Sequence, residues 1–180
     1  MITNTADRTW RRAVALVATA LIGGCAMSAH DRRSELEGPE LTDEQTRAQV
    51  VEPAKAIVQG ADLRDFTASF RFESCNDQNE APYRGVAEVV FTFPADADKH
   101  AYIDHVAAVM TRLGWDEGPP AGKMPYGRVL HQGQLMAIMA PEPDHPRFGS
   151  IDIYGECRNL TDQRSRGGLG RQDIAGELAG

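Results

Sequence analysis

The chain has 180 residues, of which 25% are charged, and its net charge at neutral pH is −7. Nucleic-acid binding needs clustered lysine and arginine, so this acidic balance excludes nucleic acid as a partner. The length suits one domain with a modest hydrophobic core, and no internal repeat is evident.

Residues 1–24 have the layout of a bacterial export signal. A basic segment comes first, with Arg8, Arg11 and Arg12. The apolar run from Ala13 to Gly24 has 12 residues, fewer than the roughly 20 that a permanent transmembrane helix needs. It fits the apolar region of a secretory signal, about 7–15 residues long. Small residues at its end predict cleavage between Gly24 and Cys25.

The stretch Leu21–Cys25, with the sequence LIGGC, resembles the lipobox of bacterial lipoproteins. The resemblance implies that Cys25 receives a diacylglyceryl thioether, that lipoprotein signal peptidase cleaves before it, and that its new amine is a site of acylation. Two or three acyl chains hold a protein stably on a membrane. We therefore expect a lipid anchor on the extracytoplasmic face of the cell membrane. The alternative is a soluble secreted protein in which Cys25 is buried.

The mature chain is expected to begin with a tether. Loss of residues 1–24 removes three arginines and one aspartate, which changes the net charge from −7 to −9. Such a chain is not attracted to an anionic leaflet, so the lipid is its expected membrane contact. Residues 25–41 are polar, contain Gly38-Pro39 and lack apolar periodicity, which predicts an acylated cysteine followed by a flexible segment.

Residues 42–158 carry the periodic patterns of a folded domain. Thr42 is the expected N-cap of a first helix, and Gln45 completes a capping box. An apolar stripe then runs to Gly60, with Pro53 as a point where the helix either kinks or divides. A second helix is expected from Pro94 to Leu113.

Alternating apolar and polar residues predict the strands. We expect them at 66–74 and 85–93, in a hairpin over 128–140 that turns at 132–133, and at 150–158. Short connections favour an antiparallel sheet of about five strands with two helices packed on one face, an α+β fold. Residues 159–180 are rich in glycine and charge and are expected to form a disordered tail.

Three cysteines are present, and the lipid anchor uses Cys25. In an exported protein the remaining two, Cys75 and Cys157, predict a structural disulfide. Two free thiols or half of a metal site are the alternatives. Cys75 is out of phase with the phenylalanine face of strand 66–74, so we place it at the end of that strand.

No arrangement of residues predicts a catalytic, metal or cofactor site. His100 and His105 are five residues apart on the second helix, whereas metal-binding pairs prefer four. The chain has no Gly-x-Ser-x-Gly elbow, glycine-rich phosphate loop or His-Glu-x-x-His motif. The proline-rich loop 118–126 is either a plain connection or a contact surface.

The signal stretch 20–25 with Met27, the strand sequence 151–157 and one earlier cysteine resemble small mycobacterial and related actinobacterial lipoproteins of the LppA-like kind. The resemblance implies an envelope lipoprotein of undefined activity, and it supplies no catalytic residue. We expect a non-enzymatic, membrane-anchored module that binds an envelope protein or a small ligand. The alternatives are a cell-envelope hydrolase whose residues converge only in the fold and a purely structural role.

Overall fold

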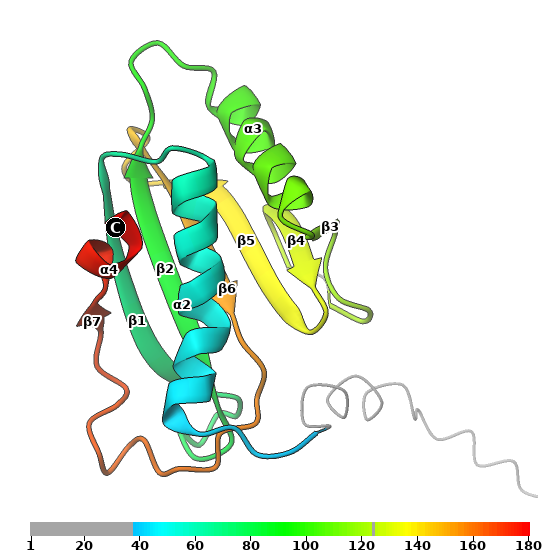
Figure 1. The fold of residues 1–180 in the computed structure, drawn as a ribbon, viewed down its shortest axis with the longest axis vertical. Helices are drawn as coiled ribbons and strands as arrows, with labels where there is room; N and C mark the ends of the chain where they lie inside the picture. The colour runs from blue at the N-terminus through cyan, green and yellow to red at the C-terminus, as the bar shows by residue number, and fades with distance from the viewer. Residues whose placement is uncertain (1–37, 124) are drawn as a thin grey trace, which may run out of the picture.

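The computed structural model describes residues 38–123 and 125–180, which form an antiparallel sheet covered by helices on one face (Figure 1). The α+β class and the disulfide are confirmed, but the described residues form seven strands and three helices instead of five and two. The helices are α2 (Asp43–Gly60), α3 (Lys99–Arg112) and α4 (Ala175–Ala179). The strands are β1 (Phe66–Ser74), β2 (Tyr83–Thr92), β3 (Asp116–Glu117), β4 (Arg128–Gln132), β5 (Leu135–Pro141), β6 (Phe148–Tyr154) and β7 (Gln172–Asp173).

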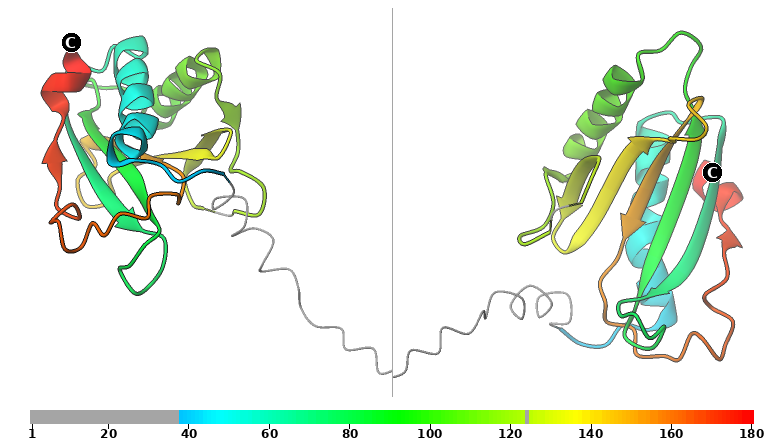
Figure 2. Two further views of the ribbon diagram at one scale, coloured as in Figure 1. Left: turned by 60° about the horizontal axis from the view of Figure 1, so that its bottom comes forward. Right: turned by 180° about the vertical axis from the view of Figure 1, so that it is seen from behind.

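The sheet has the order β3-β4-β5-β6-β2-β1-β7, and every pair is antiparallel. The two strands that the sequence does not predict, β3 and β7, have two residues each and form the two edges. Both α2 and α3 lie on the same face of the sheet, as expected, and the described residues place no helix on the opposite face (Figure 2). Within the described ranges, no helix combines the length and apolar character needed to cross a bilayer.

Helix α2 forms as the sequence predicts. The Thr42 hydroxyl accepts a hydrogen bond from the Gln45 backbone (3.2 Å), and the Gln45 side chain accepts one from the Thr42 backbone (2.9 Å), which closes the capping box. Pro53 does not divide the helix, which is continuous over 18 residues. Its apolar stripe is buried against the sheet and includes Val50, Ala54 and Ile57.

Helix α3 begins later than the sequence predicts. Asp96 has φ 63°, a left-handed conformation that cannot belong to an α-helix, and Pro94 to Ala97 forms a turn. The Asp98 carboxylate then accepts hydrogen bonds from the backbones of His100 and Ala101 (2.9 and 3.1 Å). The helix therefore starts where a side chain can cap its free amide groups, not at the proline.

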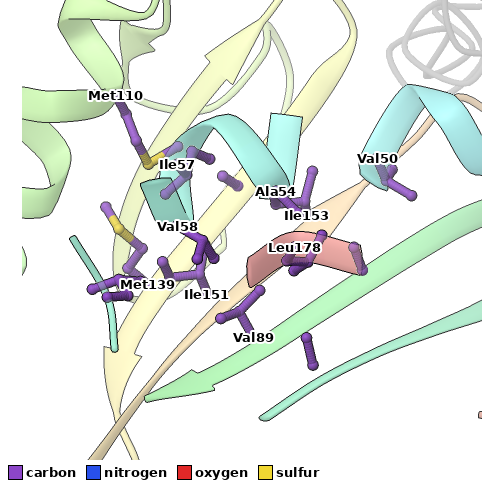
Figure 3. Close-up of a cluster of buried hydrophobic side chains, with 14 of the residues drawn as sticks. Val50, Ala54, Ile57, Val58, Val89, Met110, Met139, Ile151, Ile153 and Leu178 are labelled. Carbon is purple, nitrogen blue, oxygen red and sulfur yellow. The ribbon is translucent and has the colours of Figure 1, made fainter. Parts of the chain in front are cut away.

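The hydrophobic core lies between the sheet and the two long helices (Figure 3). The strands contribute one alternating face each, because residues paired across the register share a face. The fully buried side chains include Phe70, Ile151, Ile153, Met110 and Leu178. All but Leu178 come from segments whose apolar periodicity is visible in the sequence.

The C-terminal segment corrects the expectation of a disordered tail over 159–180. Strand β7 pairs with β1, and α4 lies against β1 and α2 (Figure 1). Ile174 is 2% exposed and Leu178 is fully buried, so these two side chains complete the core. Arg47 of α2 also pairs with Glu177 at 2.5 Å. Only two buried apolar residues help to hold this glycine-rich segment in place, and they are too few to form a visible periodic pattern.

Candidate functional site

The disulfide predicted from the sequence is present between Cys75 and Cys157, whose Cα atoms are 6.0 Å apart. Cys75 directly follows β1, as expected, and Cys157 lies three residues after β6. A link between residues 82 apart in the sequence contributes about 4 kcal/mol to the free energy of unfolding on a chain-entropy model. The predicted lipidation site, Cys25, lies outside the described residues.

The disulfide lies at the end of the molecule where the described chain begins. The backbone N–H of Leu41 donates to the carbonyl of Arg158 (2.9 Å), and the Arg158 guanidinium donates to the carbonyl of Pro39 (3.2 Å). The first described residues are therefore fixed to the segment that carries Cys157. We call this the proximal end of the domain.

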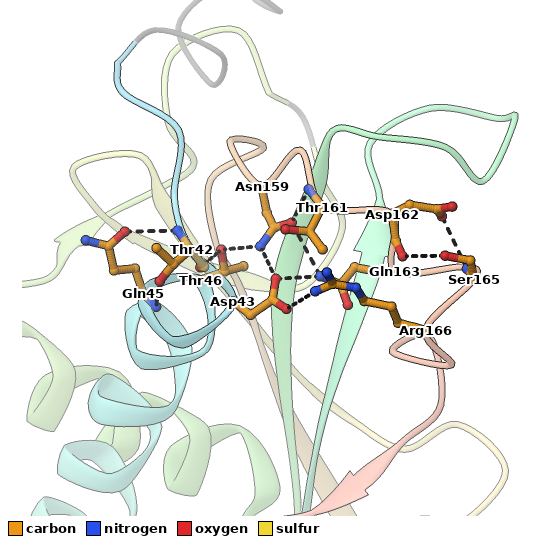
Figure 4. A network of polar contacts seen from close by, with 10 residues as sticks. All are labelled: Thr42, Asp43, Gln45, Thr46, Asn159, Thr161, Asp162, Gln163, Ser165 and Arg166. Carbon is orange, nitrogen blue, oxygen red and sulfur yellow. Dashed lines mark hydrogen bonds and ion pairs between the residues drawn. The ribbon is translucent and has the colours of Figure 1, made fainter.

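A polar network at the proximal end joins the C-terminal segment to the first turn of α2 (Figure 4). The Asp43 carboxylate accepts hydrogen bonds from the side-chain amides of Asn159 (2.8 Å) and Gln163 (2.6 Å). Asn159 is fully buried and also donates to the Thr46 hydroxyl (3.2 Å). A carboxylate in the first turn suits the helix dipole. The polar groups of the network are hydrogen-bonded to one another, so we interpret the network as structural.

In the proline-rich loop 118–126, the side chain of Tyr126 is 96% exposed. Pro120 is buried, and the Nδ1 atom of His131 lies 2.9 Å from the carbonyl oxygen of Gly118. These contacts tie the start of the loop to β4. Its role as a contact surface stays a prediction.

A cleft of about 850 Å³ lies at the end of the sheet opposite the proximal end. It is lined by residues from the loops 62–65, 92–99 and 146–147 and by Tyr102 of α3; we call it the distal cleft. Figure 1 shows these loops at the top, and the described chain enters at the bottom. Two smaller clefts of about 580 and 450 Å³ are lined by residues of the proximal end.

The loops of the distal cleft are held together through the end of β2. The backbone N–H of Thr92 donates to the carbonyl of Asp65 (2.9 Å), and that of Phe93 donates to the carbonyl of Arg147 (3.0 Å). Segments that are far apart in the sequence are thereby fixed around one strand end.

The floor of the distal cleft is aromatic. The rings of Phe93 and Tyr102 meet edge to face with centroids 5.7 Å apart, and Phe91 lies 5.3 Å from Phe93 beneath them. Phe93 is only 8% exposed, whereas Tyr102 is half-buried. Burial, and then the negative charge of Asp62, raise the pKa of the Tyr102 hydroxyl above its ordinary value. The hydroxyl is therefore a neutral hydrogen-bonding group at physiological pH.

The rim of the distal cleft carries charges of both signs. Asp62 and Arg64 form an ion pair with each other (3.0 Å). In the described part of the chain, no ion pair involves the remaining four charged side chains of the lining, which are Asp65, Asp96, Lys99 and Arg147. Asp62 and Asp96 both have positive φ, 50° and 63°. Non-glycine residues with positive φ are uncommon, and they cluster at functional sites.

The face of the sheet without helices carries a second group of charged side chains. Glu73 of β1 pairs with Arg71 (2.8 Å) and with Arg84 of β2, whose guanidinium lies 4.6 Å from the ring centroid of Tyr154. Burial alone would raise the pKa of Glu73, but hydrogen bonds and charge from Arg84 and Arg71 lower it below its ordinary value. This part of the face is therefore neutralised by its own ion pairs.

Asp152 lies in the same face, on β6, directly opposite Glu88 of β2. Burial and the charge of Glu88 raise the pKa of Asp152 to about 6. Glu88 has cationic partners, Arg71 at 3.8 Å and Arg171, which contacts it directly. No set of three or more His, Cys, Asp or Glu side chains within 38–123 and 125–180 could hold a metal ion.

The sequence does not reveal the distal cleft, because its residues come from three loops. The sequence pattern predicts a helix start at Pro94-Ala95-Asp96 and no role for the loop 62–65 or residues 146–147. The available signal was composition, since the loop 94–99 combines proline, two aspartates and a lysine. His100 and His105, by contrast, are exposed on α3 and do not line this cleft.

Comparison with known proteins identifies relatives over most of the chain. The family model of the putative lipoprotein LppJ matches residues 42–177. Proteins described as putative lipoprotein LppJ from Mycobacterium tuberculosis and Mycobacterium bovis are 43% identical over 170 residues, which cover 88% of this chain and 89% of theirs. No solved structure matches the chain at a significant level. The resemblance to small mycobacterial lipoproteins is thus confirmed, and the chain belongs to the LppJ lipoprotein family.

Proposed function

We propose that the chain is a non-enzymatic binding protein, tethered through lipidated Cys25 to the extracytoplasmic face of the cell membrane, with the distal cleft as its ligand site. Membership of a lipoprotein family supports the tether. The cleft supports binding, because its space of about 850 Å³ is lined by aromatic rings and by charged side chains that form no ion pair with other described residues. Small-molecule sites typically have volumes of about 300–1,000 Å³.

The single observation that carries the proposal is the composition of the cleft. Its lining provides cations, carboxylates, aromatic rings and prolines, and it includes no serine, cysteine or histidine. These side chains recognise a ligand by charge and stacking. The hydroxyl groups of the lining belong to Thr92 and Tyr102, and no histidine of the lining is available to act as their general base.

The position of the cleft supports a role away from the membrane. Helix α2 begins at the proximal end with Asp43 and ends beside Asp62 of the cleft. Its 18 residues span roughly 27 Å at about 1.5 Å per residue. A ligand site at that distance from the tether opens away from the anchored end.

The test is a ligand-retention experiment with the full chain in detergent micelles. The protein is incubated with the low-molecular-weight fraction of a mycobacterial envelope extract and washed, and retained compounds are identified by mass spectrometry. Ala95→Trp places a large side chain in the cleft, and Ala121→Trp adds the same group to the exposed proline-rich loop. We expect compounds retained by the wild type and by Ala121→Trp to be lost from Ala95→Trp.

Two results would contradict the proposal. Retention of no compound by the wild-type chain, or equal retention by Ala95→Trp, would rule out the distal cleft as the ligand site. Conversion of a retained compound into a product during incubation would refute the non-enzymatic part and favour the hydrolase alternative.

A further inference from the structure

We infer that the distal cleft binds a small zwitterion, namely a free amino acid or short peptide with an apolar side chain. The inference rests on the proposed binding function and names the chemical class of its ligand. It follows from the charge pattern of the rim, from the aromatic floor between the charges, and from the size of the cleft.

The rim offers two positive and two negative side chains that lack ion pairs among the described residues: Lys99, Arg147, Asp65 and Asp96. A purely anionic ligand would satisfy the two cations and bring its charge close to the two aspartates, which would repel it. A purely cationic ligand would pair with the two aspartates and be repelled by Lys99 and Arg147. A ligand with one ammonium and one carboxylate matches both pairs at once, and such complementarity gives specificity against singly charged competitors.

The aromatic floor fits the apolar part of such a ligand. The half-buried ring of Tyr102 and the ring of Phe93 line the cleft together with Pro94 and Pro146. An apolar or aromatic side chain would lose its hydration shell against these groups. A ligand ammonium placed over the Tyr102 ring would also gain a cation–π attraction.

The cleft is prepared for binding before a ligand arrives. The backbone hydrogen bonds from Thr92 to Asp65 and from Phe93 to Arg147 fix the loops that carry a carboxylate and a cation on opposite sides of the end of β2. The Asp98 cap fixes the start of α3, where Lys99 lies. Fixed loops reduce the ordering cost of binding, so a ligand as small as a dipeptide can be held.

The probe for the test is the dipeptide alanyl-phenylalanine, measured by saturation-transfer NMR and calorimetry with the full chain in micelles. Two blocked forms are compared with it, the N-acetyl dipeptide, which lacks the ammonium, and the C-terminal amide, which lacks the carboxylate. We expect the free dipeptide to bind and each blocked form to bind at least five-fold more weakly, because each loses one charge-assisted contact.

Variants test which rim residues bind the carboxylate of the dipeptide and which bind its ammonium. Lys99→Gln combined with Arg147→Gln is expected to weaken binding of the free dipeptide and to abolish the advantage of a free carboxylate. Asp96→Asn, which suits the left-handed backbone at this position, is expected to reduce the advantage of a free ammonium. Lys55→Gln and Asp144→Asn are matched controls outside the cleft and should leave binding unchanged.

The outcomes separate this inference from the proposed function. If compounds are retained in the cleft but blocked and free dipeptides bind equally, or if none binds, the zwitterion inference is wrong and the binding function stands. Tighter binding of glycerophosphocholine than of the dipeptide would also overturn the inference, since a quaternary ammonium cannot donate to a carboxylate. If Ala95→Trp retains every compound, the proposed function fails first.

Discussion

Asp152 shows how one carboxylate can lower the stability of the whole sheet. It lies opposite Glu88 in the register of β2 and β6, and like charges directly opposite each other destabilise an antiparallel pair. Its pKa rises from 3.8 in the unfolded chain to about 6 in the folded protein, mainly through burial. The folded state therefore binds the proton more tightly, and ionisation at neutral pH costs stability.

The direction of the pH effect follows from this raised pKa. As the pH rises from about 4 to above 6, ionisation of Asp152 lowers the free energy of unfolding by about 3 kcal/mol. We predict that Asp152→Asn stabilises the protein by about 1–3 kcal/mol at pH 7 and has little effect at pH 4. Urea unfolding of both proteins between pH 4 and pH 7 measures the difference.

Asp144→Asn serves as the control, because Asp144 is an exposed aspartate in the loop before β6. Its pH profile should follow that of the wild type. If the stability difference between Asp152→Asn and the wild type stays constant across this range, the raised pKa is not its cause.

At the level of elements, the C-terminal segment depends on very few side chains. Leu178 of α4 is fully buried, and α4 has only five residues, too few to be stable as a helix by itself. We predict that Leu178→Ala destabilises the protein by about 2–4 kcal/mol, as is typical for a buried leucine. Loss of this side chain should also release α4 from β1 and α2.

Chemical denaturation measures the loss of stability, and hydrogen exchange of residues 172–180 measures release of the segment. Leu160→Ala is the matched control, since Leu160 is 57% exposed and should contribute little. An effect of Leu178→Ala no larger than that of Leu160→Ala would show that α4 does not stabilise the fold.

The sequence predicts the elements whose signals are local. The Thr42 capping box and the stripe of α2 identify that helix to within a residue, and the alternating phenylalanines identify β1. The predicted start of α3, at Pro94, is several residues too early. Proline and aspartate are typical of a first helical turn, and the sequence does not show that the backbone of Asp96 is left-handed. Segments fixed by tertiary contacts, such as α4 and the two-residue strands, leave no periodic pattern.

The sequence predicts even less of the candidate site than of the fold, because tertiary contacts bring most of its residues together. The Cys75–Cys157 pair is predictable because export and cysteine number leave few choices. The distal cleft is not, because Asp65, Lys99 and Arg147 each look like ordinary surface residues in their own segments. Only the pairing of β2 with its neighbours brings the three loops to one end of the sheet.

At the scale of the whole molecule, the proposed anchor makes its own prediction. Cys25→Ala removes the thiol that would carry the lipid, so the protein should remain an uncleaved precursor or leave the membrane fraction. Fractionation of cells, with mass spectrometry of the N-terminus, measures this. Ser28→Ala should stay in the membrane fraction, and a mature N-terminus at another residue would contradict the lipoprotein assignment.

The attachment of Leu41 to Arg158 has a mechanical consequence. A pull on the chain before Gly38 is transmitted through this contact to the segment beside Cys157, which the disulfide links covalently to the end of β1. The force therefore acts on the crosslinked end of the domain, and the loops around Tyr102, at the far end of α2, are outside its path. If Cys25 carries the proposed lipid, movement of the membrane would pull on this end of the domain, and we expect the distal cleft to keep its shape.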